Sequence, residues 1–160
     1  MYTLSLIHHK LYHSGGRTAF PCATTWRKKW FANPFTIYSY AYPNPYYGCY
    51  GIEFSPDGSK LYAASAAMGS VNPGDIGRVF QFDLKSHEPE NILASAVLLN
   101  VPDFASYFGS LQLGPNGKIY VVRLSQLYLG VIQNPNAAGT ACQYKKEGVN
   151  LGEGLLLRLT

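Results

Sequence analysis

Acidic residues are absent from the first 50 positions of this 160-residue sequence, a segment that holds five lysine or arginine residues. The other 110 positions hold eight basic and nine acidic residues, so the net charge of +4 arises from the amino-terminal third. A basic segment can bind nucleic acid or an anionic membrane surface. Because the rest of the chain is nearly neutral, we do not expect nucleic acid as a partner.

Long hydrophobic runs are also absent, although 47% of the residues are hydrophobic and only 14% are charged. No stretch approaches the roughly 18 consecutive apolar residues of a membrane-spanning helix, so we expect no membrane span. The composition is nevertheless too apolar for a disordered chain. The opening residues, MYTLSLIHHKLYHSGG, lack a basic segment followed by a clean apolar core, so they do not indicate a signal peptide.

Cysteine is scarce, because the sequence has only Cys22, Cys49 and Cys142, and none belongs to a Cys-x-x-Cys motif. Two outcomes stay open: a Cys49–Cys142 disulfide, or free thiols with Cys142 packed as a small apolar residue. His9 and His13 have the spacing for a shared metal on a helix, but no carboxylate lies in the first 50 residues. We therefore expect no metal, no cofactor and no catalytic residues in this chain.

One phrase occurs twice, at residues 51–65 (GIEFSPDGSKLYAAS) and 109–123 (GSLQLGPNGKIYVVR). Each copy has an apolar run, a turn, and a lysine followed by a second apolar run containing tyrosine. A repeat spaced by roughly 60 residues indicates supersecondary units that stack on similar neighbours.

The turns of the two copies have the same chemistry. Pro presets φ, Asp or Asn bonds the nearby backbone, and Gly accepts a positive φ. A calcium loop would need alternating acidic residues, which are missing here, so we interpret these positions as structural turns. The turn residues are Pro56, Asp57, Gly58, Pro115, Asn116 and Gly117.

The repeats predict an all-β fold, a partial β-propeller with about two blades of four antiparallel strands each. The first blade spans 51–99, with strands at 51–54, 61–65, 78–84 and 92–99, and the second spans 109–145, with strands at 110–113, 118–123, 128–132 and 140–144. Residues 1–36 show no sustained period and form an irregular basic segment. Residues 37–160 form the partial propeller, with extra strands expected at 37–47 and 154–160.

The phrases FSPDGSKLY and GRVFQFDL resemble the WD40-like (PD40, TolB-type) β-propeller repeat. In that repeat a first strand ends in Ser-Pro-Asp-Gly, a second begins with Lys and an apolar pair, and a third ends in Asp-Leu. Residues 51–152 also resemble the N-terminal propeller of large secreted Bacteroidetes proteins, through the series GIEFSPDGSKLY, GRVFQFDL, GSLQLGPNGKIYV, LGVIQNPNAAGTACQY and GVNLG. Those proteins usually carry PKD or other Ig-like domains and a C-terminal type IX secretion or gliding-motility sorting domain.

This resemblance implies an extracellular or cell-surface location and the remaining blades of a parent propeller as partners. The chain departs from those proteins at both ends, because it reads GEGLLLRLT after GVNLG and residues 1–36 match nothing in them. We therefore expect a fragment or a frame-shifted product of a longer protein.

The favoured function is a non-catalytic interaction module that binds a protein or glycan. Tyrosine and phenylalanine offer large rigid contact area, and loops 66–77 and 99–109 are the expected contact segments. Two alternatives stay open: a fragment of a propeller-fold hydrolase or lyase with its catalytic residues in missing blades, and a structural spacer. The predicted contact residues are Tyr46, Tyr47, Phe104, Tyr107 and Phe108.

Overall fold

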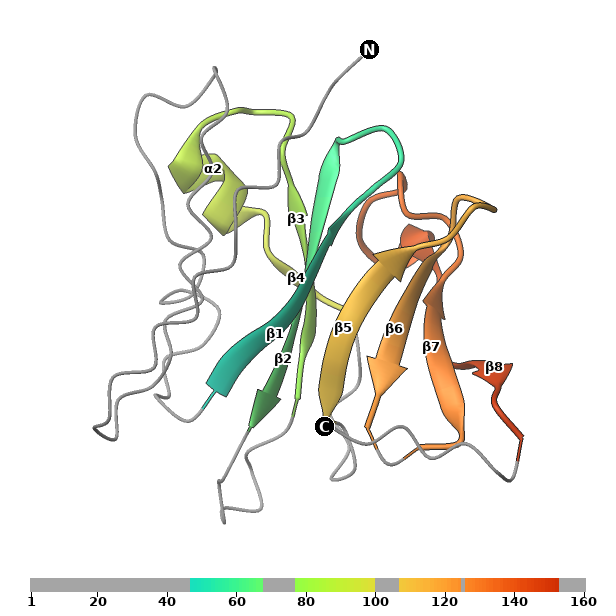
Figure 1. The fold of residues 1–160 in the computed structure, drawn as a ribbon. Coiled ribbons are helices and arrows are strands. Elements are labelled where there is room, and N and C mark those ends of the chain that lie inside the picture. Colours follow the sequence, from blue (N-terminus) through green and yellow to red (C-terminus); the bar gives the residue numbers. More distant parts are fainter. Residues whose placement is uncertain (1–46, 68–76, 100–106, 125, 153–160) are drawn as a thin grey trace.

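The computed structural model describes residues 47–67, 77–99, 107–124 and 126–152, without the side chains of residues 47–50 and 66–67. The predicted irregular segment 1–36, the predicted strand at 154–160 and all but the last residue of the predicted strand at 37–47 lie outside these ranges. The fold is all-β, as the sequence predicts. The described chain forms two four-stranded antiparallel sheets that lie beside each other as blade-like units and do not close on themselves (Figure 1).

The first sheet has the order β1-β2-β3-β4, in which each strand pairs with the next along the chain. β1 (Tyr47–Phe54) and β2 (Lys60–Ala67) form the hairpin of the first repeat. β3 (Val79–Asp83) pairs with β2, and β4 (Val97–Leu98) is a short edge strand. Successive side chains of β3 point to opposite faces of the sheet. One face carries Val79, Gln81 and Asp83, and the other carries Phe80 and Phe82.

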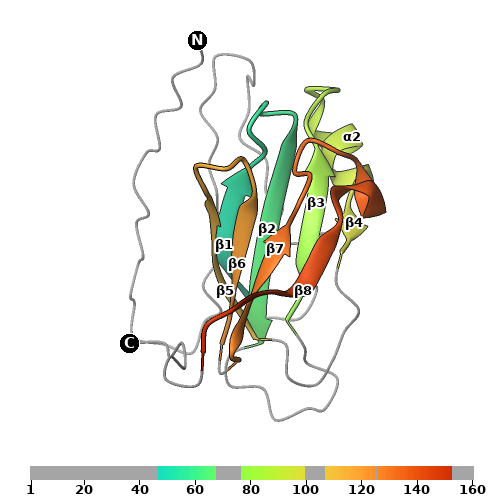
Figure 2. The ribbon, with the colours of Figure 1, turned by 90° about the vertical axis from the view of Figure 1, so that its right-hand side faces the viewer.

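The second sheet repeats this order with β5-β6-β7-β8. β5 (Phe108–Leu113) and β6 (Ile119–Arg123) form the hairpin of the second repeat. β7 (Tyr128–Ile132) pairs with β6, and β8 (Tyr144–Asn150) forms the far edge, nearest the viewer in Figure 2.

The fourth strand of the first sheet differs from the prediction. Instead of a strand over 92–99, the chain forms a helix, α2 (Pro89–Ala94), before the two-residue β4. Pro89 stands in the first helical turn, where its fixed φ suits a helix, and Glu90 places a negative charge near the helix N-terminus. Ile92, the first residue of the predicted strand, therefore lies in this helix, and its side chain is fully buried.

The fourth strand of the second sheet is also displaced from its predicted position. Residues Gly139–Cys142 form a short 3-10 helix, η1, where the sequence predicts a strand over 140–144. Gln143 follows η1 with a left-handed φ of 54°, which ends this short helix before β8. β8 begins at Tyr144 and continues to Asn150, so it extends past residue 145.

The two sheets pack front to back. In each sheet we define the front face as the one that carries the first apolar residue after the repeated lysine, which is Leu61 in β2 and Ile119 in β6. The back face carries the next residue, a tyrosine in both copies, Tyr62 and Tyr120. The back face of the first sheet lies against the front face of the second, so equivalent residues of the two repeats have the same orientation in the stack.

The core lies between the sheets. It combines residues from the back face of the first sheet with residues from the front face and η1 of the second. These buried residues are Tyr62, Ala64, Val79, Phe108, Leu111, Ile119, Val121, Ile132 and Cys142.

Candidate interaction site

The structure describes the side chains of two of the five predicted contact residues, Tyr107 and Phe108, and these two lie in different surroundings. Tyr46 and Phe104 lie outside the described residues, and Tyr47 begins β1 with its side chain undescribed. Tyr107 is 40% exposed immediately before β5. Phe108 is 1% exposed and belongs to the core between the sheets, so its assignment to a contact surface is wrong. Strand alternation explains the difference, since adjacent residues face opposite sides.

The six turn residues lie at the tips of the two hairpins. Gly58 and Gly117 have φ values of 70° and 74°, and each donates its N–H to the carbonyl three residues earlier, at 2.8 Å to Ser55 and 3.0 Å to Gly114. Pro56 and Pro115 precede the Asx residues and are exposed. The two turns therefore share one backbone geometry, which requires glycine at its last position.

The first turn contains one extra residue, Ser59, and Asp57 binds it. The Asp57 carboxylate accepts hydrogen bonds from Ser55 Oγ (2.7 Å), Ser59 N (2.9 Å) and Ser59 Oγ (3.0 Å). Partial burial raises the pKa of Asp57, but these hydrogen bonds and the charge of Lys60 outweigh it and hold the pKa below its ordinary value. In the part of the chain that the structure describes, no group of three or more His, Cys, Asp or Glu residues gathers around a possible metal position.

Two buried polar side chains of the first sheet bind a loop of the second. Tyr62 donates its hydroxyl to the carbonyl of Pro135 (2.7 Å) and accepts a hydrogen bond from Gln81 Nε2 (2.7 Å). Gln81 Nε2 also donates to the carbonyl of Ala137 (2.8 Å), and its Oε1 accepts from Gly139 N (2.7 Å). We call this arrangement the inter-sheet clasp.

The clasp was not visible in the sequence. Tyr62 and Gln81 occur in ordinary strand patterns, and their partners on the loop lie 56 to 73 positions further along the chain. The only local signal is the polar residue Gln81 between Phe80 and Phe82, which alternation places on the opposite face from both rings.

Burial favours the neutral form of two ionisable groups here, Tyr62 of the clasp and Cys142 beside it. Burial raises the pKa of Tyr62, although the hydrogen bond from Gln81 acts in the opposite direction. Burial also raises the pKa of the Cys142 thiol. Cys142 is a buried free thiol, so the proposed disulfide with Cys49 is absent and the packing alternative holds for Cys142. Neither group has the lowered pKa of an activated nucleophile.

The two sheets also meet near their hairpin tips. Glu53 Oε2 accepts a hydrogen bond from Leu113 N (2.9 Å), and Asp57 N donates to Asn136 Oδ1 (3.3 Å). At Gly51 the backbones of β1 and β5 approach so closely that a Cβ there would lie 2.7 Å from Leu111 N. These contacts position the loops of the two sheets relative to each other.

Among the described residues, the repeated lysine pairs with a carboxylate in the first sheet and not in the second. Lys60 has a side chain that is 2% exposed, and its Nζ lies 3.1 Å from Asp83 Oδ2. Burial raises the pKa of Asp83, but hydrogen bonds from Lys85 N and Lys60 Nζ outweigh it and lower the pKa. In the second sheet Lys118 stands at the place of Lys60, and Gln133 at the place of Asp83.

The polar groups described above form contacts within the fold. The exposed apolar side chains are the remaining candidates for contact with a partner. Four large hydrophobic residues are at least 37% exposed among the described residues, and a shallow hollow lined by residues 88–91 lies at the start of α2. The exposed residues are Leu98, Tyr107, Leu127 and Val149.

No family model matches this chain, and no curated protein or solved structure matches it. None of the helices in the described ranges is long and apolar enough to cross a membrane.

Proposed function

We propose that this chain is a non-catalytic interaction module of a secreted or cell-surface protein, and that it binds a protein or glycan through loops held at the ends of stacked sheets. The observation that carries this proposal is the front-to-back packing of two equivalent sheets. Repeated units stacked in one orientation give a stiff support, and loops on a stiff support make effective binding surfaces.

The proposed parent architecture is a β-propeller. Sheets that repeat in one orientation can continue into a longer stack, and the front face of the first sheet is the equivalent of the face that the second sheet buries. Its Ile52, Phe54 and Phe80 are only half-buried, which supports the packing of a preceding blade against them. The extracellular location rests on the resemblance of the sequence to secreted propeller proteins.

The chemistry of the described side chains supports a binding role. The buried polar residues Tyr62, Gln81 and Lys60 hydrogen-bond or pair within the fold and connect its strands and sheets. The Asp57 carboxylate is directed to its own turn. Polar groups in such contacts stabilise the loops. Contact with a ligand would then come from exposed residues such as Tyr107.

The experiment is a binding screen with a matched pair of variants. The chain is tested against arrays of glycans and of cell-surface proteins, and each ligand found is measured with Tyr107→Ser and Leu98→Ser. Both residues are 40% exposed, so each substitution removes a side chain that is exposed to the same fraction. We expect Tyr107→Ser to weaken binding roughly tenfold or more and Leu98→Ser to leave it unchanged.

Two results would overturn the proposal. One is the absence of any ligand on either array for the folded chain, which would favour a structural spacer. The other is the appearance of hydrolysis or elimination products from a bound glycan, detected by mass spectrometry, which would make the module catalytic.

A further inference from the structure

The second repeat contains the one Asn-Gly pair of the sequence, Asn116–Gly117. The pair lies at the tip of the hairpin formed by β5 and β6, and Asn116 is exposed. The side-chain amide of an asparagine can be attacked by the backbone nitrogen of the next residue. This attack is easiest when the next residue is glycine, which has no Cβ to obstruct it. Asn116 therefore has both the local sequence and the exposure of a modification site.

The other asparagines of the chain are less suited to this reaction. Four of them precede proline, whose backbone nitrogen belongs to a ring and has no hydrogen to lose. The remaining four precede alanine or a larger residue, so a Cβ stands beside the attacking nitrogen. Asn136 is the best internal comparison, because it is also exposed and is followed by Ala137.

The folded turn engages both reacting groups in hydrogen bonds. Gly117 N, the attacking atom, donates to the carbonyl of Gly114 at 3.0 Å. The Asn116 amide is bound at both ends, because its Nδ2 donates to the Tyr120 hydroxyl at 2.9 Å and its Oδ1 accepts from Lys118 N at 3.3 Å. An amide held in this way cannot turn its Cγ toward Gly117 N until a hydrogen bond breaks. Of these bonds, only the one to Tyr120 can be removed by a substitution that leaves the backbone and Asn116 unchanged.

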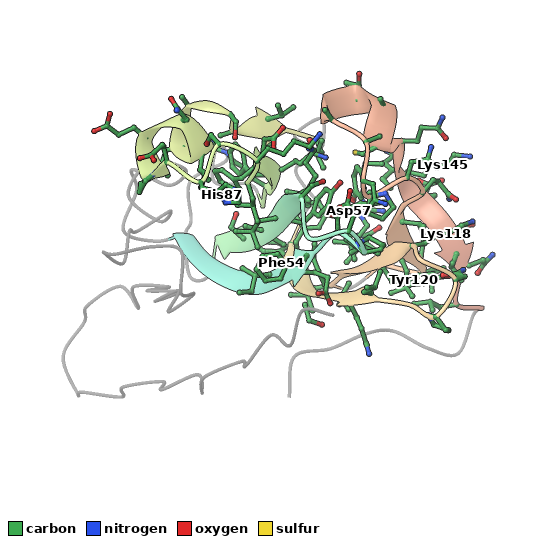
Figure 3. The ribbon with its side chains drawn as sticks, turned by 90° about the horizontal axis from the view of Figure 1, so that it is seen from above. Phe54, Asp57, His87, Lys118, Tyr120 and Lys145 are labelled. Carbon is green, nitrogen blue, oxygen red and sulfur yellow. The ribbon has the colours of Figure 1, made fainter. Side chains whose placement is uncertain are left out.

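The first repeat has an aspartate at the equivalent position of its turn. Seen from above, Asp57 lies on the first hairpin and Tyr120 on the neighbouring one (Figure 3). The Asp57 carboxylate accepts hydrogen bonds from Ser55 Oγ, Ser59 N and Ser59 Oγ. An aspartate undergoes the same attack only in its protonated form, which is scarce near neutral pH. The two turns therefore share one backbone geometry, but only the second carries a side chain that reacts readily at neutral pH.

We propose that Asn116 is a site of spontaneous deamidation and that the Tyr120 hydroxyl controls its rate. Gly117 N gives up its proton to solvent and forms a bond to Asn116 Cγ. The Cγ–Nδ2 bond then breaks and ammonia leaves with a proton from solvent, which produces a cyclic succinimide. Water opens the succinimide at either carbonyl to give aspartate or isoaspartate, so the sequence of steps is redox-neutral and consumes only water. The inference goes beyond the proposed function, because it requires no ligand.

The two products have different effects on the hairpin. Aspartate leaves the main chain intact, and Asp57 shows that the equivalent turn accepts it. Isoaspartate adds a methylene to the main chain inside the turn, so the hydrogen bond from Gly117 N that closes the turn no longer fits. Both products replace the amide that donates to Tyr120 with a negative charge. Deamidation therefore changes the charge of the turn in both cases and its geometry in one.

The experiment incubates the folded chain at mildly alkaline pH and follows each asparagine by peptide mapping with mass spectrometry. Replacement of the amide by a carboxyl changes the peptide mass, and electron-transfer fragmentation distinguishes aspartate from isoaspartate. The test variant is Tyr120→Phe. Its matched control is Tyr128→Phe, which removes the hydroxyl of another half-buried strand tyrosine. Circular dichroism and thermal unfolding establish that each variant is folded.

We expect Asn116 to be modified first among the described asparagines, with both products formed while Asn136 stays intact. Tyr120→Phe should raise the rate at Asn116 roughly three- to tenfold, the factor that one net hydrogen bond supplies, and Tyr128→Phe should leave it unchanged. Earlier modification of another described asparagine would overturn the inference, as would equal rates in the two tyrosine variants. A rise in the Tyr120 variant that is matched at Asn136 would reflect general unfolding and would also overturn it.

Discussion

Tyr62 and Tyr120 occupy the same place in the two repeats but differ in what holds them. Tyr62 is fully buried, and its hydroxyl connects the first sheet to the loop of the second at Pro135. Tyr120 is half-exposed and bonds Asn116 in its own turn. From the sequence alone, the two tyrosines cannot be distinguished as buried or exposed. Their different burial depends on whether another sheet packs against the back face of their own sheet.

The paired substitutions Tyr62→Phe and Tyr120→Phe test this difference. Loss of the Tyr62 hydroxyl leaves the carbonyl of Pro135 without its donor and Gln81 with one acceptor fewer. We expect it to lower the free energy of unfolding by about 1–3 kcal/mol. The Tyr120 substitution should change it by less than about 0.5 kcal/mol. Urea denaturation followed by circular dichroism compares the two, and equal effects would contradict a clasp role for Tyr62.

The Lys60–Asp83 pair is asymmetric, so its two partners should respond differently to mutation. Asp83→Asn leaves a lysine that is 2% exposed without its anion, whereas Lys60→Met leaves a carboxylate that is 39% exposed to water. We expect Asp83→Asn to destabilise the chain by about 1–2 kcal/mol more than Lys60→Met. Denaturant titration at neutral pH measures both, and a larger effect of Lys60→Met would contradict the argument.

The same pair also predicts a pH dependence. The pKa of Asp83 is lower in the folded state than its ordinary value of 3.8. A depressed carboxyl pKa contributes stability that is fully present above the unfolded pKa and is lost as the pH falls through the folded pKa. Unfolding free energies measured from pH 6 down to pH 2 should therefore fall less steeply below about pH 4 in Asp83→Asn than in the wild type.

At the scale of elements, local turn chemistry made the hairpins predictable. The Pro-Asx-Gly sequences place the two turns and the strands on either side of them. The fourth strands were predicted less well, because an apolar run such as ILASAVLL fits a strand or a short buried helix equally. Pro89 and Glu90 were the available signal for α2. The clasp could not be predicted, since its residues meet only after the sheets have stacked.

Gly51 controls how closely β1 approaches β5. A Cβ at this position would lie within 2.8 Å of backbone atoms of residues 109–111, which cannot move without shifting the strand. Gly109→Ala is the control, because its nearest neighbour is the Val122 side chain at 3.1 Å, which can rotate. We expect Gly51→Ala to destabilise the chain by about 1–3 kcal/mol and Gly109→Ala by less. Thermal unfolding compares the two variants. A larger loss of stability in Gly109→Ala than in Gly51→Ala would contradict this expectation.

At the scale of the whole molecule, the shared core makes the two sheets one cooperative unit. The back face of the first sheet and the front face of the second are buried against each other. If either sheet unfolds, the face that it covers on the other sheet becomes exposed to water. Regions that lose their burial together unfold together. We therefore expect amides of β2 and of β6 to exchange with similar protection, even though the two strands belong to different sheets.

Val121 and Val122 provide the test, because they are neighbours in β6 on opposite faces. Val121 is fully buried between the sheets, and Val122 is half-buried on the back face of the second sheet. Val121→Ala removes methyl groups from the shared core and should lower stability by about 1–3 kcal/mol. Hydrogen exchange should show equal loss of protection in β2 and β6. Val122→Ala should cost less and spare β2. A Val121→Ala effect confined to the second sheet would show that the sheets unfold independently, and the stack would then be two modules joined by a weak interface.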